Sequence, residues 1–203
     1  MSLKRWQTLM TLCQLPPSIS CFDALAQAYS EPHRYYHTAM HISAMLHHFD
    51  VIKEQANEPH LIELAIWFHD AIYRPFAQDN ERASANWAEE FLHDAGLSAQ
   101  ATEKVVELIM ATVHDQQSDD PDTQLLIDLD LSILGAEPDT YDNFEQQIRS
   151  EYRWVPGIIY RRKRKAILLE FLARDPLFKT DYCQQEFESK ARANLTRAVT
   201  LLS

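Results

Sequence analysis

Residues 64–73 read Leu-Ala-Ile-Trp-Phe-His-Asp-Ala-Ile-Tyr, an apolar run with an imidazole and a carboxylate side by side near its centre. Burying both groups costs several kcal/mol unless each finds a partner. A bound cation is one partner that satisfies both at once. Neighbours on a helix point about 100° apart, so the long His69 and the short Asp70 can converge on an ion between them. The pair therefore predicts the centre of a metal site on a buried helix.

The composition favours a helical fold. The chain has 203 residues, 46% of them hydrophobic, which is enough for a sizeable core in one domain. Only 3 residues are glycine, which argues against a β-sandwich or a glycine-rich nucleotide-binding sheet. We predict an all-α, single-domain helical bundle over 1–203, with a metal-site core at 30–135 and C-terminal helices 138–202 packed on it. Apolar spacing predicts a helix at 3–13 and a second helix that starts from a cap at Ser18 or Ser20 and carries Tyr29. Further helices are predicted at 38–55, 60–73, 82–95, 98–113, 124–135, 138–152, 158–173 and 184–202.

Charge and cysteine content limit the partners. The net charge of -11 opposes binding along a nucleic-acid duplex, because phosphate neutralisation needs the opposite sign. A small anionic substrate remains compatible, since a metal and a few Arg set the local field. The 3 cysteines form no CxxC pattern, which fits a reducing compartment. Because no apolar run reaches the roughly 18–20 residues of a bilayer span, we expect no membrane partner and a cytoplasmic location.

Other histidines could complete the site. Two further His-Asp pairs, at 93–94 and 114–115, lie at helix ends in polar surroundings, so only residues 69–70 are embedded in an apolar run. His37 and His41 are four apart, the spacing that puts two side chains on one helix face. If Thr38 caps the helix, His37 stands just outside it and leans over the same site.

Asp128 and Asp130 lie in a strongly apolar helical stretch, where unpaired carboxylates are costly. They are two residues apart and so point to nearly opposite sides of a helix. One of them can reach a metal while the other makes a salt bridge or a hydrogen bond to a ligand histidine. The spacing alone leaves both assignments open.

The ordered set His41, His69-Asp70 and Asp130 resembles the H…HD…D signature of the HD-domain metal-dependent phosphohydrolases. The segments 36–41 and 130–132 are also similar to the cyclic-nucleotide phosphodiesterase branch. Over residues 30–195 the chain is more similar to a bacterial subfamily of predicted HD phosphohydrolases. The resemblance implies an all-α fold of this type, in which His41, His69, Asp70 and Asp130 hold a divalent metal ion. Mixed nitrogen and oxygen ligation suits Mn, Fe, Zn or Mg and does not choose among them. The matching segments are 67–70, 79–85, 128–135, 149–152 and 191–195.

Two departures from that pattern affect the expected chemistry. One-metal members often have Glu three residues after the Asp, where this chain has Tyr73. By likeness to the phosphodiesterases the proton donor is then His37, with Asp79 or Glu81 as the alternative. Diiron members place extra His between the HD pair and the last Asp. His114, and less readily His93, would serve a second metal here, and Asp128 would serve that metal or support a ligand.

The resulting hypothesis is hydrolysis of a phosphate ester of a nucleotide or other small metabolite by a metal-activated water. Asp70 or Asp130 would help take the proton from the water, and His37 would protonate the leaving oxygen. Arg34 and Arg149 are the expected phosphate anchors, and Asp79 an expected substrate contact. The alternatives are a diiron oxygenase, which depends on His114, and a non-catalytic binding or regulatory module. A homodimer stays open, and the basic run 161–165 is interpreted as a solvated face.

Overall fold

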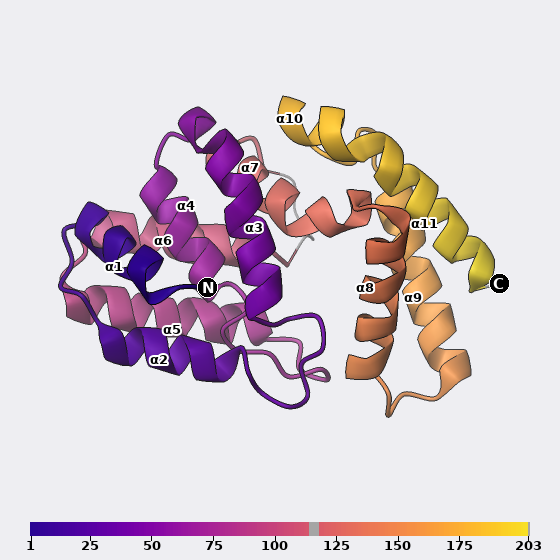
Figure 1. Ribbon diagram of the computed structural model, residues 1–203, viewed down its shortest axis with the longest axis horizontal. Coiled ribbons are helices and arrows are strands. Elements are labelled where there is room, and N and C mark those ends of the chain that lie inside the picture. Colours follow the sequence, from indigo (N-terminus) through magenta and orange to yellow (C-terminus); the bar gives the residue numbers. More distant parts are fainter. Residues whose placement is uncertain (114–117, 203) are drawn as a thin grey trace. The chain divides into compact units, whose positions relative to one another are not determined.

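The computed structural model describes residues 1–113 and 118–202 (Figure 1). Over these residues every regular element is a helix and none is a strand, so the all-α prediction is confirmed. Within the same residues, no helix combines the length and the apolar character that crossing a bilayer requires. The chain packs as two compact units, Met1–Ile127 and Asp128–Ser203, and each is described by itself. The prediction of one domain over 1–203 stays a prediction.

The first unit is built around helix α4 (Pro59–Phe68), the observed counterpart of the apolar run. Pro59 stands in its first turn, where a missing N–H costs nothing. α4 packs against four helices of the unit, and its ring contacts include Trp67 on Trp6, with centroids 5.3 Å apart. From Leu61 to Phe68 every residue of α4 except Glu63 is buried, which explains why this part of the helix is almost entirely apolar. The other elements are α1 (Leu3–Leu12), α2 (Ile19–Ala28), α3 (Ala39–Ile52), η1 (Lys53–Gln55), α5 (Asn80–Ala95), α6 (Ala99–Ala111) and the start of α7 (Pro121–Asp130).

The end of α4 differs from the predicted helix 60–73. The helix stops at Phe68, with His69 as its C-cap and Asp70 in the following turn. The physical reason is a distant side chain. The Arg34 guanidinium donates to the carbonyl oxygens of Asp70 (2.7 Å) and Ala71 (3.0 Å), which takes these acceptors out of a helical pattern. The carboxylate of Asp70 is therefore presented from a turn.

Most other helix boundaries follow local signals. Thr38 caps α3 by accepting the N–H of Met40, so His37 stands just outside the helix as expected. α5 ends at Gly96, whose φ of 93° is the left-handed value that glycine adopts easily. Two predicted helices are subdivided. The segment 124–135 is α7 followed by the 3-10 turn η2 (Leu131–Gly135), and the last helix begins earlier, at Asp181.

The second unit is held together around α11 (Ser189–Leu201), which packs on α9 (Gly157–Leu172) and on η2. The buried amide of Asn194 donates to the carbonyl oxygens of Leu134 (3.0 Å) and Ala136 (2.9 Å) and so fixes the end of η2. Gly135 is required there, because a Cβ would lie 2.7 Å from the Phe187 Cα. The remaining elements are α8 (Pro138–Glu151), α10 (Asp181–Cys183) and the π-helical η3 (Gln184–Glu188).

Candidate metal centre

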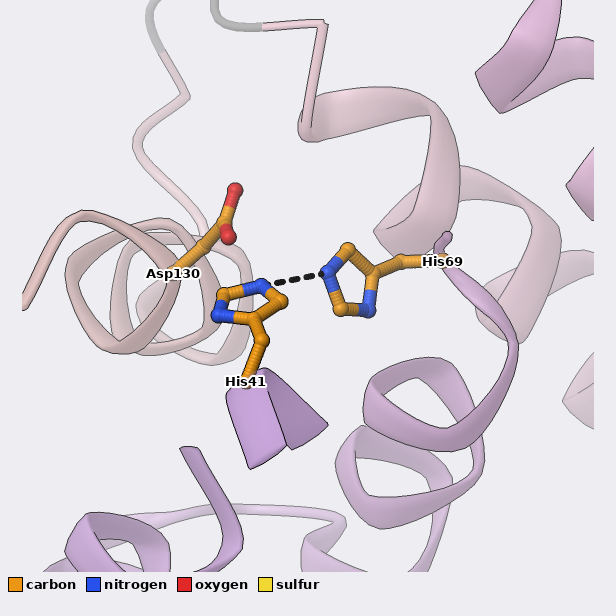
Figure 2. Close-up of side chains that lie close together, drawn as sticks. All are labelled: His41, His69 and Asp130. Atoms are coloured by element: carbon orange, nitrogen blue, oxygen red, sulfur yellow. Dashed lines mark hydrogen bonds between the residues drawn. The ribbon is translucent and has the colours of Figure 1, made fainter. Parts of the chain in front are cut away.

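Three of the four predicted ligands form one group. One ligand atom each of His41, His69 and Asp130 lies within 4.8 Å of those of the other two, and both histidines are buried. Figure 2 shows the two imidazoles pointing at each other with the Asp130 carboxylate beside them. His41 comes from the first turn of α3, His69 from the end of α4 and Asp130 from the last residue of α7. The group could hold a metal ion.

Helix α7 is fixed at its start by hydrogen bonds to its own unit. The buried Asp122 carboxylate accepts the backbone N–H groups of Asn57 (2.8 Å) and Glu58 (2.9 Å), just ahead of α4. Asp120 binds the Lys104 ammonium at 2.8 Å. Residues 121–127 of α7 belong to the first unit, and Asp130 ends the same continuous helix. The start of α7 is therefore tied to the residues just ahead of α4.

The two histidines face each other through their Nε2 atoms. His69 Nδ1 lies 3.0 Å from the carbonyl oxygen of Ile66, which only accepts, so Nδ1 carries the proton and Nε2 of the neutral ring does not. His69 Nε2 is 3.2 Å from His41 Nε2. His41 Nδ1 meets the Tyr36 hydroxyl at 3.0 Å, and a hydroxyl can donate or accept. Tyr36 can thus accept the His41 Nδ1 proton and leave both Nε2 atoms unprotonated.

The Asp70 carboxylate joins the same point. Its Oδ2 lies 3.2 Å from His69 Nε2 and 3.7 Å from His41 Nε2. Burial by itself would raise the pKa of Asp70. When His69, His37 and His41 are protonated, their positive charges and a hydrogen bond from His69 outweigh burial, so the pKa of Asp70 lies below its usual range. The Asp70 carboxylate is ionised at neutral pH. When both histidine rings are neutral, at most one proton lies between His41 Nε2, His69 Nε2 and Asp70 Oδ2.

These separations suit a small cation. Ligands about 2.1 Å from an octahedral ion lie about 3.0 Å from their neighbours. The two 3.2 Å separations, between the imidazole Nε2 atoms and between His69 Nε2 and Asp70 Oδ2, are close to that value. Two imidazole nitrogens with carboxylate oxygens suit Mn²⁺, Fe²⁺ or Zn²⁺. They suit Mg²⁺ less well, because Mg²⁺ prefers oxygen ligands. The donor set fits a divalent ion and does not choose among these metals.

Arg34 has a different role from the predicted phosphate anchor. Its side chain has 0% exposure, and it donates to the backbone carbonyls of His37 (3.1 Å), Asp70 and Ala71 and to the Glu31 carboxylate (2.9 Å). These bonds tie the segment before α3 to the turn after α4. A buried guanidinium engaged in this way is a poor anchor for an incoming phosphate. Arg34 instead positions the backbone that presents His37 and Asp70.

His37 lies at the edge of the cluster. Its ring stacks on Tyr73, with centroids 4.1 Å apart, and lies 6.3 Å from the His41 ring. It is half-buried, and its charge contributes to the lowered pKa of Asp70. Tyr73 occupies the position three residues after Asp70 where the one-metal pattern often has Glu, and its ring supports His37 from the side. The placement matches the expectation that His37 leans over the site, and its role as proton donor stays a prediction.

Three other predicted site residues lie in separate surroundings. Asp79 is exposed and its carboxylate pairs with Arg74 at 3.0 Å. Glu81 is half-buried in the first turn of α5, and its proton-donor role stays a prediction. Arg149 lies in the second unit, where its guanidinium donates to the carbonyls of Tyr152 and Val155 and covers the Tyr160 ring at 4.6 Å. Its predicted contact with a phosphate stays a prediction.

The Asp128 carboxylate is occupied by hydrogen-bond donors of the second unit, which makes it a poor metal ligand or support for a ligand histidine. Its carboxylate accepts the N–H groups of Lys179 (2.9 Å) and Thr180 (2.6 Å) and the Thr180 hydroxyl (2.7 Å). The group is fully buried and pins the segment that starts α10. The proposed second-metal residue His114 lies outside the described residues. The pair 93–94 is exposed, as expected for a surface pair.

Sequence reasoning missed the partners of the ligands. The Arg34 guanidinium lies within cation-π distance of Tyr29 (5.3 Å) and Tyr73 (5.5 Å), and the Tyr36 hydroxyl orients His41. Tyr36 lies in the segment 36–41 with both histidines, so its hydroxyl is the one signal by which the sequence could have indicated a partner for His41.

Comparison with known proteins adds no further guide to the site. No protein-family model matches the chain, and the searches of curated proteins and of solved structures gave no match.

Proposed function

We propose that this protein is a metal-dependent phosphohydrolase that cleaves a phosphate ester of a nucleotide or another small metabolite. His41, His69, Asp70 and Asp130 would hold the divalent ion. The observation that carries the proposal is the convergence of two imidazole nitrogens and two carboxylates on one point. His41 Nε2, His69 Nε2 and Asp70 Oδ2 meet within 3.7 Å, and a ligand atom of Asp130 completes a 4.8 Å group with the histidines. Such a cluster is costly without a cation.

When bound, a divalent ion would lower the pKa of a water and neutralise charge on a phosphoryl oxygen. The chain's own residues supply the rest. Asp70, ionised and at the rim of the group, would accept a proton from the attacking water. His37, held against Tyr73, would donate a proton to the leaving oxygen. The resemblance to HD-domain phosphohydrolases, through residues 41, 69–70 and 130, supports the same assignment.

Two other functions would use the same cluster. A diiron oxygenase needs a second metal, and His114, the residue on which that alternative depends, lies outside the described residues. A binding or regulatory module needs the cation site but no turnover. Neither is favoured by a particular observation, so both serve as outcomes of the test.

The experiment compares two His-Asp pairs of one chain. Protein freed of metal would be reloaded separately with Mn²⁺, Fe²⁺, Zn²⁺ and Mg²⁺, and bound metal measured by elemental analysis. Phosphate release from nucleoside monophosphates and opening of cyclic nucleotides would then be assayed. His69→Ala should lose both metal and activity. His93→Ala, at a histidine with 84% exposure that pairs with its neighbour Asp94 at 3.4 Å, is the matched control.

Metal-dependent hydrolysis that is abolished by His69→Ala and retained by His93→Ala would support the proposal. Hydrolysis that survives His69→Ala would overturn it. Two irons per chain with O₂ consumption would favour the oxygenase. Ligand-dependent stabilisation of the metal-loaded protein without any product would favour the binding module.

A further inference from the structure

Helix α9 of the second unit is apolar on a face that points to solvent. Leu168 is the buried residue of the helix, and Arg164 beside it binds Glu145 of α8 at 2.7 Å. These two residues define the inner side. Ile158 is 76% exposed and Leu169 is 46% exposed. A helix that is hydrophobic on both sides normally has a partner on both sides.

The residues of the outer side follow from the helical period of about 100° per residue. Ile158, Arg162, Ala166 and Leu169 recur at spacings of four, four and three residues, which puts them in one stripe opposite Arg164. All four are exposed. Glu170 flanks the stripe. We refer to residues 158, 159, 162, 166, 169, 170 and 173 as the α9 outer face.

The α9 outer face is complementary to itself. Arg162 and Glu170 each lie four residues, or about 6 Å, from Ala166 on opposite sides along the helix. If two copies of α9 run antiparallel and cross at Ala166, Arg162 of each copy meets Glu170 of the other. Ile159 then lies opposite Ala173. A small residue at the crossing permits close approach, and a two-fold axis satisfies every contact twice.

We propose that this face is a docking surface for a second copy of the same chain, giving an antiparallel α9 pair centred on Ala166. A single helix pair is a small interface, so the expected dissociation constant is in the micromolar range, about 1–100 µM. The proposal concerns the second unit alone and does not depend on the function proposed for the metal centre.

An anionic lipid surface is the main competitor, because Trp154 just before α9 is 74% exposed and Arg161, Arg162 and Lys163 are exposed. The charge pattern favours a second copy. Glu170 lies within the outer face and opposes an anionic membrane. The same acidic residue is attractive to Arg162 of a partner copy.

The test is a charge exchange followed by sedimentation velocity on the full chain over the micromolar range. Arg162→Glu and Glu170→Arg should each weaken dimerisation about tenfold or more, because each creates two like-charge contacts. An equimolar mixture of the two single variants should dimerise, since every contact is then opposite in sign. The double variant R162E/E170R should also dimerise. Arg161→Glu, the same charge change one position away and off the face, is the matched control and should leave dimerisation unchanged.

Ala166→Glu places two carboxylates at the axis and should abolish the dimer. Circular dichroism of each variant would verify that α9 still folds. A wild-type chain that stays monomeric throughout the range would overturn the proposal, as would equal weakening by Arg161→Glu and Arg162→Glu. A mixture that dimerises no better than its components would do the same. A monomer that binds phosphatidylglycerol vesicles through Arg162 would assign the face to lipid instead.

Discussion

Two aspartates, one in each unit, meet opposite surroundings. The Asp128 carboxylate is fully buried and receives N–H and O–H donors from Lys179 and Thr180 at 2.6–2.9 Å. The Asp70 carboxylate lies 3.2 Å from Nε2 of His69, which is itself an acceptor when the neutral ring carries its proton on Nδ1. One group is satisfied by the protein alone. The other is satisfied only by a proton or a cation, and this difference separates a structural carboxylate from a ligand.

The comparison makes opposite predictions for the two carboxylates. Removing a satisfied acceptor leaves buried donors without partners and lowers stability. Removing an acceptor that faces other acceptors relieves repulsion in the metal-free protein and lowers metal affinity. Substitutions that remove a functional residue commonly raise the stability of the protein in this way.

The largest effect is expected from Asp128→Ala. Lys179 and Thr180 lose the acceptor of their N–H groups, so the free energy of unfolding should fall by about 3 kcal/mol. With Asp128→Asn, which keeps one carbonyl oxygen, the fall should be smaller. Urea denaturation measures both, and bound metal per folded chain should be unchanged. A loss below about 1 kcal/mol would mean that the hydrogen bonds of Asp128 are not important for the second unit.

Metal itself should stabilise the first unit. At a free concentration of about 100 times the dissociation constant, a divalent ion that binds only the folded chain adds about 2.7 kcal/mol. Thermal unfolding with and without Mn²⁺ measures this as a rise in Tm that a chelator reverses. Asp70→Ala should remove the rise, and Asp94→Ala, at the exposed His-Asp pair, should retain it. An equal rise in Asp70→Ala would place the metal elsewhere.

Tyr36→Phe tests the orientation of a ligand. Without the hydroxyl, His41 Nδ1 loses its 3.0 Å partner, and metal affinity should fall about tenfold. Tyr35→Phe, at a neighbouring tyrosine with 42% exposure, is the control and should leave affinity unchanged. Isothermal titration gives both affinities. Equal affinity in the two variants would show that Tyr36 does not orient His41.

The smallest effect has the opposite sign. Asp70→Asn replaces an ionised acceptor with an amide that can donate to His69 Nε2, 3.2 Å from the present Oδ2. In the presence of a chelator the variant should be more stable than wild type by about 1 kcal/mol. Denaturation in urea with excess chelator measures the difference. A loss of stability would mean that the metal-free cluster is already satisfied.

The helices could be predicted because their signals are local. The 3.6-residue apolar period, the cap at Thr38 and the glycine at 96 each involve only a few neighbouring residues, and α3 and α5 have these limits in the structure. The end of α4 could not be predicted in this way. It depends on Arg34, which lies 36 residues from Asp70 in the chain and reaches its carbonyl oxygen.

The candidate site divides in the same manner. The apolar surroundings of His69 and Asp70 indicate a buried polar pair from the sequence alone. The choice between Asp128 and Asp130 could not be derived from their spacing, because each carboxylate is defined by residues far along the chain. Asp130 meets His41 and His69, whereas Asp128 meets Lys179 and Thr180.

By itself, the sequence determined an all-helical chain with a buried histidine-aspartate pair at its most apolar helix, since periodicity and burial cost depend on neighbouring residues. Only the tertiary structure decided which acceptors converge, which carboxylate is neutralised by backbone donors and which arginine holds the backbone in place. The physical reason is that a hydrogen bond or a ligand contact belongs to two groups, and for Asp128 the second group, the Thr180 hydroxyl, lies 52 residues away.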